Sequence, residues 1–186
     1  MDQASFLSGK ILLAMPGMAD PRFERAAIAM AVHDENGAVG VGIGHTRAGI
    51  RFRDLLRQLD IDPAGAPDRE VLHGGPVEPG RGFVLHSDDW GGQDTIAIVG
   101  LGAMTGTVDV LKAIAEDRGP SRWLVALGYA GWGAGQLDEE MTRHGWFAAT
   151  GCAELLFDIP AEERWEAAFR AEGIDPRLLV SEAGLA

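Results

Sequence analysis

Two glycine-rich segments hold the side chains of this sequence that are best suited to binding a ligand. Residues 73–82 offer an imidazole beside paired glycines, and residues 128–137 offer two aromatic rings and an amide. Glycine adopts backbone conformations that other residues avoid and lets the chain approach another surface closely. Tight turning without any ligand explains the same glycines. With a histidine from the intervening loop, the predicted ligand-binding residues are His73, Gly74, Gly75, His86, Tyr129, Trp132 and Gln136.

We expect both segments to face one cavity, with Tyr129 or Trp132 beside His73 or His86. The aromatic rings would form a wall of this cavity, and Gln136 would offer an amide. Trp132 favours a cleft wall over the core because the glycines on either side of it give it no periodic apolar face. The predicted function is non-enzymatic binding of a small molecule or a partner protein, in a regulatory role.

A hydrolase or transferase is the alternative function for the same residues. A histidine that titrates near neutral pH serves as a general base when a nucleophile or water lies within hydrogen-bonding reach, and His73 and His86 are the candidates. The chain has neither a Gly-x-Ser-x-Gly nucleophile turn nor a phosphate-binding Gly-Lys-Ser/Thr triplet. A dinucleotide-binding loop needs a third glycine where Gln136 stands. We therefore predict no catalytic residue.

A metal site is a further alternative at residues 86–89, where an imidazole is followed by a serine and two carboxylates. These side chains suit hard or borderline cations, but aspartates in such a loop also cap turns. No second cluster completes a coordination shell, and one cysteine, Cys152, cannot build a cysteine-based zinc site. The sequence predicts neither a metal nor a cofactor.

The charge of the chain argues against direct contact with nucleic acid. The sequence has 16 Lys and Arg against 28 Asp and Glu, so its formal net charge at pH 7 is −12. Binding to duplex DNA normally needs clustered cations, and the densest basic stretch, residues 47–57, also contains Asp54. A transcriptional regulator that contacts DNA is the least favoured function. We expect a small-molecule or protein partner, no nucleic-acid or membrane partner, and a monomer or weak homodimer.

Periodicity indicates the elements that must position these residues. Apolar residues 26–32 and 38–43 flank an Asn-Gly turn, which predicts a β-hairpin. Leu55, Leu56 and Leu59 follow Phe52 at helical spacing, which predicts a helix there. Further strands are predicted at residues 11–15, 83–85, 95–99, 123–127 and 146–149, and further helices at residues 106–117, 137–144 and 160–173.

The order of these elements favours an α+β fold, because the regular strand–helix alternation of a doubly wound sheet is absent from the first half. We predict a single compact domain over residues 1–186, with a mixed or mostly antiparallel sheet flanked by three to four helices. Residues 1–8 are expected to fray. No apolar run approaches the ~20 residues of a membrane span, and no secretory signal is recognised, so a cytoplasmic location is expected.

Several stretches match a known pattern, including Met15-Pro16-Gly17-Met18, His73-Gly74-Gly75-Pro76 and Gly131-Trp132-Gly133. With residues 33–40, 82–87, 155–157 and Trp165, they make nearly the whole chain similar to the AlgH family of bacterial proteins, also called the YqgE family. One departure is at residues 42–46, where family members usually carry an Ile-Asn-Arg/Lys-Pro-like segment. The resemblance implies an α+β fold in one unit and no established catalytic residue. The family's name, and the label of transcriptional regulator, come from a proposed role in alginate synthesis.

Overall fold

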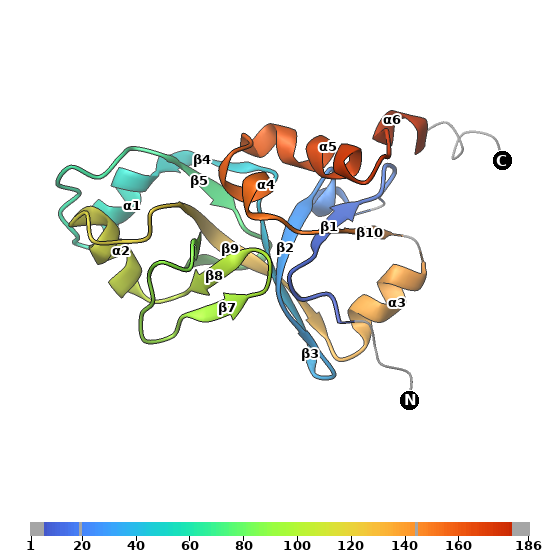
Figure 1. Ribbon diagram of the computed structural model, residues 1–186, viewed down its shortest axis with the longest axis horizontal. Helices are drawn as coiled ribbons and strands as arrows, with labels where there is room; N and C mark the ends of the chain where they lie inside the picture. The colour runs from blue at the N-terminus through green and yellow to red at the C-terminus, as the bar shows by residue number, and fades with distance from the viewer. Residues whose placement is uncertain (1–5, 19, 144, 180–186) are drawn as a thin grey trace.

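The computed structural model describes residues 6–18, 20–143 and 145–179 (Figure 1). Its strands are β1 (Ile11–Ala14), β2 (Ala27–Asp34), β3 (Gly37–Gly42), β4 (Thr46–Arg51), β5 (Glu70–His73), β6 (Val77–His86), β7 (Ile96–Ile98), β8 (Gly102–Thr105), β9 (Trp123–Gly133) and β10 (Trp146–Ala149). Its helices are the 3-10 helix η1 (Pro21–Phe23) and α1 (Phe52–Gln58), α2 (Val108–Ala115), α3 (Gln136–Thr142), α4 (Ala153–Phe157), α5 (Ala161–Ala171) and α6 (Pro176–Leu179).

The ten strands of the described residues form one sheet. Its strand order is β10-β1-β2-β3-β9-β6-β8-β7, with β5 beside β9 and β4 beside β5. All its ladders are antiparallel except that between β5 and β9. The long strand β9 pairs with β5 and β6 through its first part and with β3 through its last part, so it joins the two halves of the sheet. The predicted α+β fold with a mixed, mostly antiparallel sheet is confirmed.

Successive side chains on a strand point to opposite faces of the sheet. Both faces of this sheet carry buried apolar side chains and are covered by other parts of the chain. On β1, Ile11 and Leu13 join a core cluster that contains Trp165 of α5, whereas Leu12 joins a cluster that contains Trp132. A third cluster packs α1 and α2 against β5, β6 and β9. Figure 1 shows α5 over β1 and β2, with α1 and α2 at the opposite end of the molecule.

The described residues form six α-helices rather than three or four. The predicted helices at residues 52–59, 106–117 and 160–173 are α1, α2 and α5, and the short helix from residue 137 is α3. The additional helices, α4 and α6, have five and four residues. A single turn is too short to show an apolar stripe, which is why the sequence did not indicate them. His144, predicted to end the α3 segment, lies outside the described residues.

The two glycine-rich segments are mostly strand, although glycine-rich sequence is typical of turns and loops. β6 begins at Val77, and β9 continues to Gly133. Only residues 74–76 separate β5 from β6, and Gly74 bridges two other strands: its N–H donates to the Leu127 carbonyl at 2.8 Å, and its carbonyl accepts from the Gly42 N–H at 2.7 Å. The small residues let three segments of backbone meet closely at this point.

The chain near the N-terminus is held by His33 of β2. The Leu7 N–H donates to His33 Nδ1 at 3.0 Å, and the His33 N–H donates to Ser8 Oγ at 2.9 Å. Leu7 and Ser8, which the sequence places in a segment expected to fray, thus hydrogen-bond to β2. Residues 1–5 lie outside the described part. None of the helices in the described ranges combines the length and apolar character needed to cross a bilayer.

Candidate functional site

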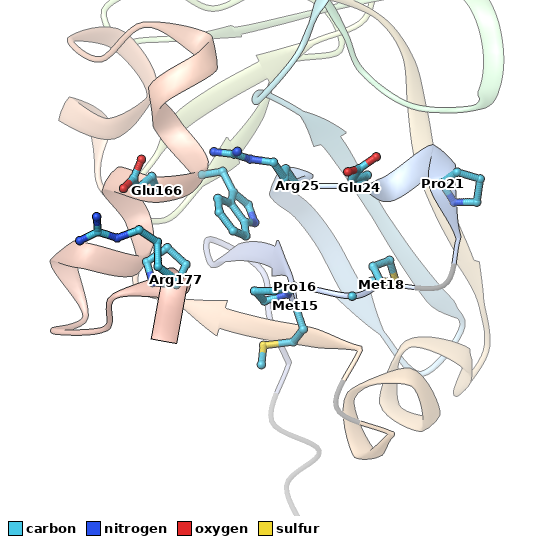
Figure 2. Close-up of a pocket in the computed structure, with 11 residues that line it drawn as sticks. Met15, Pro16, Met18, Pro21, Glu24, Arg25, Glu166 and Arg177 are labelled. Atoms are coloured by element: carbon cyan, nitrogen blue, oxygen red, sulfur yellow. The ribbon is translucent and has the colours of Figure 1, made fainter. Parts of the chain in front are cut away.

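A cavity of about 610 Å³ lies between the turn that follows β1 and the helices α5 and α6 (Figure 2). It is lined by Met15, Pro16, Gly17, Met18, Pro21, Glu24, Arg25, Trp165, Glu166, Pro176 and Arg177. We call it the Met15–Trp165 cavity. Its volume lies within the range of about 300–1,000 Å³ in which small-molecule sites are found.

The turn that forms one wall follows directly from the sequence. Pro16 and Gly17 occupy its centre, and the Met18 N–H donates to the Met15 carbonyl at 3.1 Å. Gly17 has φ +86°, the left-handed conformation that a type II turn requires after proline. The two methionines bring flexible, polarisable side chains to the cavity, and such side chains adapt to ligands of different shape.

The opposite wall is the indole of Trp165, which α5 presents to the sheet. Its Nε1–H donates to the Ala14 carbonyl at 3.0 Å, so the ring is fixed against β1. The guanidinium of Arg25 lies 4.7 Å from the centre of the ring, a cation–π contact. Arg25 itself has φ 52°, which side-chain-bearing residues rarely adopt. Helical spacing indicates a core role for Trp165; the structure confirms its burial and also places it at the cavity.

Charged groups stand at both ends of the Met15–Trp165 cavity. Glu166 and Arg177 lie at one end, and Glu24 lies towards the other (Figure 2). Arg177 is paired with Asp175 at 2.8 Å, and its hydrogen bonds lower the pKa of that carboxyl to about 2. Glu166 accepts from Arg170 at 2.6 Å. An apolar centre between charged ends suits a ligand with an apolar body and a charged group.

The structure does not bring the seven predicted site residues into one cavity. His73, Gly74 and Gly75 line a separate space of about 20 Å³, which has room for about one water molecule. Ala130 is among the described residues that line this space, but Tyr129 and Trp132 are not. The glycines in this place allow the backbone to pack closely against β9.

Trp132 is a core residue, which corrects its assignment to a cleft wall. Its side chain is only 7% exposed, and its ring meets that of Trp146 edge-on at 6.1 Å. Both indoles donate to Oε2 of Glu140, at 2.9 and 3.0 Å. The neighbouring glycines provide no contacts, but distant parts of the chain do.

Tyr129 and Gln136 also have structural surroundings. The ring of Tyr129 packs edge-on against Phe83 at 5.7 Å, and burial raises the pKa of its hydroxyl. Gln136 is exposed at the start of α3, where its Oε1 accepts from the Gly133 N–H at 3.0 Å and so closes the turn after β9.

His86 is fully buried and both of its ring nitrogens are engaged. Nδ1 lies 2.7 Å from the Ser87 carbonyl, and Nε2 lies 2.8 Å from Oγ1 of Thr105. Both nitrogens therefore already have protein partners. The carboxylate of Asp89 accepts from Ser87 Oγ at 2.6 Å, which is the turn-capping role. Within the described ranges, no three His, Cys, Asp or Glu side chains are grouped so that they could hold a metal ion.

The imidazole of His73 is expected to titrate below its ordinary pKa of 6.5. Burial is the main cause, and the positive charges of Arg47 and His45 lower the pKa further. Because the unfolded chain takes up this proton first, His73 should destabilise the fold as the pH falls from about 6.5 towards its folded pKa. An NMR titration of the histidine rings measures the midpoint. Arg47→Gln should raise the midpoint without restoring 6.5, and Arg57→Gln should not change it; a wild-type midpoint at or above 6.5 contradicts the prediction.

Sequence reasoning missed the Met15–Trp165 cavity as a site. Its walls come from residues 15–25 and 165–177, which are far apart in the chain. The available signal was the Met-Pro-Gly-Met turn, because a turn needs the proline and the glycine but neither of the two methionines.

Comparison with known proteins finds relatives that match this chain over most or all of its length. A family model described as AlgH-like matches residues 11–177. UPF0301 proteins from Novosphingobium aromaticivorans and Rhizorhabdus wittichii are 58% and 59% identical over 186 residues, with all of each chain covered.

Solved structures agree with these sequence matches. The solution structure of the AlgH protein from Pseudomonas aeruginosa aligns with a TM-score of 0.77 and 38% identity, covering 100% of this chain and 99% of that one. A crystal structure from Corynebacterium diphtheriae, 20% identical, has the same fold with a TM-score of 0.73 over 96% of this chain and 94% of that one. Sequence and fold therefore agree that this chain belongs to the AlgH-like family, whose members include the UPF0301 proteins.

Proposed function

We propose that this protein binds a small molecule in the Met15–Trp165 cavity, without catalysing a reaction on it, and that occupancy of the cavity regulates a partner protein. The observation that carries the proposal is the stack of Arg25 on Trp165, beside the apolar turn of Met15 and Met18. The pair offers a flat apolar surface and a cation in one place. A ligand with an apolar ring or chain and an anionic group fits this chemistry.

The backbone of Arg25 supports the same proposal. Its left-handed φ of 52° costs free energy for a residue with a side chain, and such strain is found preferentially at functional positions. A binding role is favoured over the hydrolase or transferase alternative because the candidate bases lie elsewhere: His86 is enclosed, and His73 faces a space for about one water molecule.

The proposal includes a cytoplasmic location and action without direct DNA contact. Cys152 is an exposed free thiol, which a reducing compartment protects from oxidation. The net charge of −12 disfavours phosphate backbones. We further propose a monomer or weak homodimer, with the regulated partner being a protein.

An anionic fluorophore, 8-anilinonaphthalene-1-sulfonate, provides a probe with an apolar body and one negative charge. We expect it to bind with saturation and to shift the amide resonances of Gly17, Met18 and Arg25 and the indole N–H of Trp165. Met15→Trp should fill the cavity and weaken binding at least about tenfold, a loss of about 1.4 kcal/mol.

Val99→Trp is the matched control, because it adds the same ring at a side chain that is 88% exposed. It should leave the affinity unchanged. Shifts confined to another surface, or equal affinity in the Met15→Trp variant, would overturn the proposal.

A further inference from the structure

A second cleft lies at the N-terminal end of α5 and gathers arginines in an otherwise acidic chain. Two cavities, of about 340 and 220 Å³, share Arg69, Trp123, Leu124, Pro160 and Arg164 as lining residues. Arg122 lines the larger one. The three arginines come from separate segments: one directly before β5, one directly before β9 and one from α5. We call this the arginine cleft; none of the three lines the Met15–Trp165 cavity.

Arg164 is the buried cation of the arginine cleft. Arg164 is only 4% exposed, and its Nη1 donates to the Ile43 carbonyl at 2.7 Å. Its Nε is buried and has no hydrogen-bond partner. Among the described residues, it forms no ion pair with a carboxylate. A buried guanidinium that lacks an acceptor for one N–H is costly, so an acceptor bound in the cleft that Arg164 lines would stabilise it.

Arg164 stays charged at neutral pH although its surroundings lower its pKa. Burial lowers the pKa of its guanidinium to about 10, and the negative charges of Glu162 and Glu70 act in the opposite direction. A pKa of about 10 still leaves the group protonated near neutral pH. The cleft therefore contains a permanent, poorly compensated positive charge.

The other two arginines are positioned by aromatic rings at the mouth of the cleft. The Arg69 guanidinium lies 4.2 Å from the centre of the Trp123 ring, and its Nη1 donates to the Trp123 carbonyl at 3.2 Å. Arg122 lies 5.2 Å from the centre of the Phe157 ring and is paired with Asp158. These contacts orient both side chains without using all of their N–H donors.

From this geometry we infer that the arginine cleft binds the phosphate group of a small phosphorylated molecule. Three arginines, one of which has a buried unpaired donor, line cavities whose only lining carboxylates in the described chain belong to Asp158 and Glu70. Guanidinium groups recognise phosphate and carboxylate oxygens through charge-assisted hydrogen bonds. A phosphate monoester carries close to two negative charges and three acceptor oxygens, which matches three arginines better than one carboxylate does.

Inorganic phosphate is the probe for this inference, titrated near neutral pH at constant ionic strength. NMR spectra that include the arginine Nε–H resonances follow the binding. We expect a saturable shift of the Arg164 Nε–H and of the Trp123 amide. Arg69→Ala and Arg164→Met should each weaken binding by about tenfold, because each removes a charge-assisted hydrogen bond.

Arg57→Ala is the matched control, since Arg57 is an exposed arginine of α1 paired with Asp54. It should bind phosphate as the wild type does. If Arg164→Met does not fold, Arg69→Ala decides the outcome, because the Arg69 side chain is exposed and its loss leaves the core intact. The inference is overturned by the absence of a saturable shift, by equal losses in the Arg57 variant, or by acetate binding as well as phosphate.

Discussion

Replacement of Gly75 by alanine is expected to lower the free energy of unfolding by about 3 kcal/mol or more, or to prevent folding altogether. Gly75 has φ +153°, a conformation that residues with a side chain rarely adopt. An added Cβ would overlap the carbonyl group of Tyr129 and lie 2.5 Å from the Ala130 nitrogen. Both neighbours are backbone atoms of the central strand β9, so neither can rotate away.

Urea unfolding measured by circular dichroism tests this expectation. Gly80→Ala is the matched control, because a Cβ at Gly80 meets nothing within 4 Å. Its free energy of unfolding should stay within about 0.5 kcal/mol of the wild-type value. A Gly75→Ala protein as stable as Gly80→Ala would show that the β5–β6 connection can move away from β9, and that the glycine is free for a role at a ligand.

Trp132→Ala is expected to cost about 3–5 kcal/mol of stability, as large aromatic deletions in a core do. The ring is 7% exposed and shares a core cluster with Leu12 and Met30. Its loss also removes the hydrogen bond to Glu140 and the edge contact with Trp146. Glu140 would then be left with one of its two indole partners.

The measurement is the urea midpoint of the variant against the wild type, with the slope unchanged if the transition remains two-state. Trp132→Phe should cost less than the alanine variant, because it keeps an aromatic ring and loses the indole donor. An unchanged midpoint in Trp132→Ala would contradict the core assignment and return this residue to the wall of a cleft.

The elements that follow local patterns are determined by the sequence alone. The Asn-Gly turn and its apolar flanks predict the β2–β3 hairpin, and the structure pairs Asp34 with Gly37 at its tip. The helical spacing from Phe52 predicts α1, and Pro160 with two following glutamates predicts α5. These features arise within about ten residues, so the chain's own periodicity carries them. By contrast, β4 shows no such pattern, because its side chains are mostly exposed and it forms only beside β5.

The positions of the candidate sites depend on contacts between distant segments, which no local pattern contains. Trp132 is flanked by glycines on both sides, yet it is buried because Trp146 and Leu12 reach it from other strands. The glycines of residues 73–82 and 128–137 suggest a ligand loop, but their small size is used where β5 and β6 meet β9. Trp165 meets the Met15 turn across about 150 residues of chain, and Arg164 is enclosed beside Trp123 in the same way. Only the tertiary structure brings these groups together, because burial and approach are properties of the packed sheet and not of the neighbouring residues.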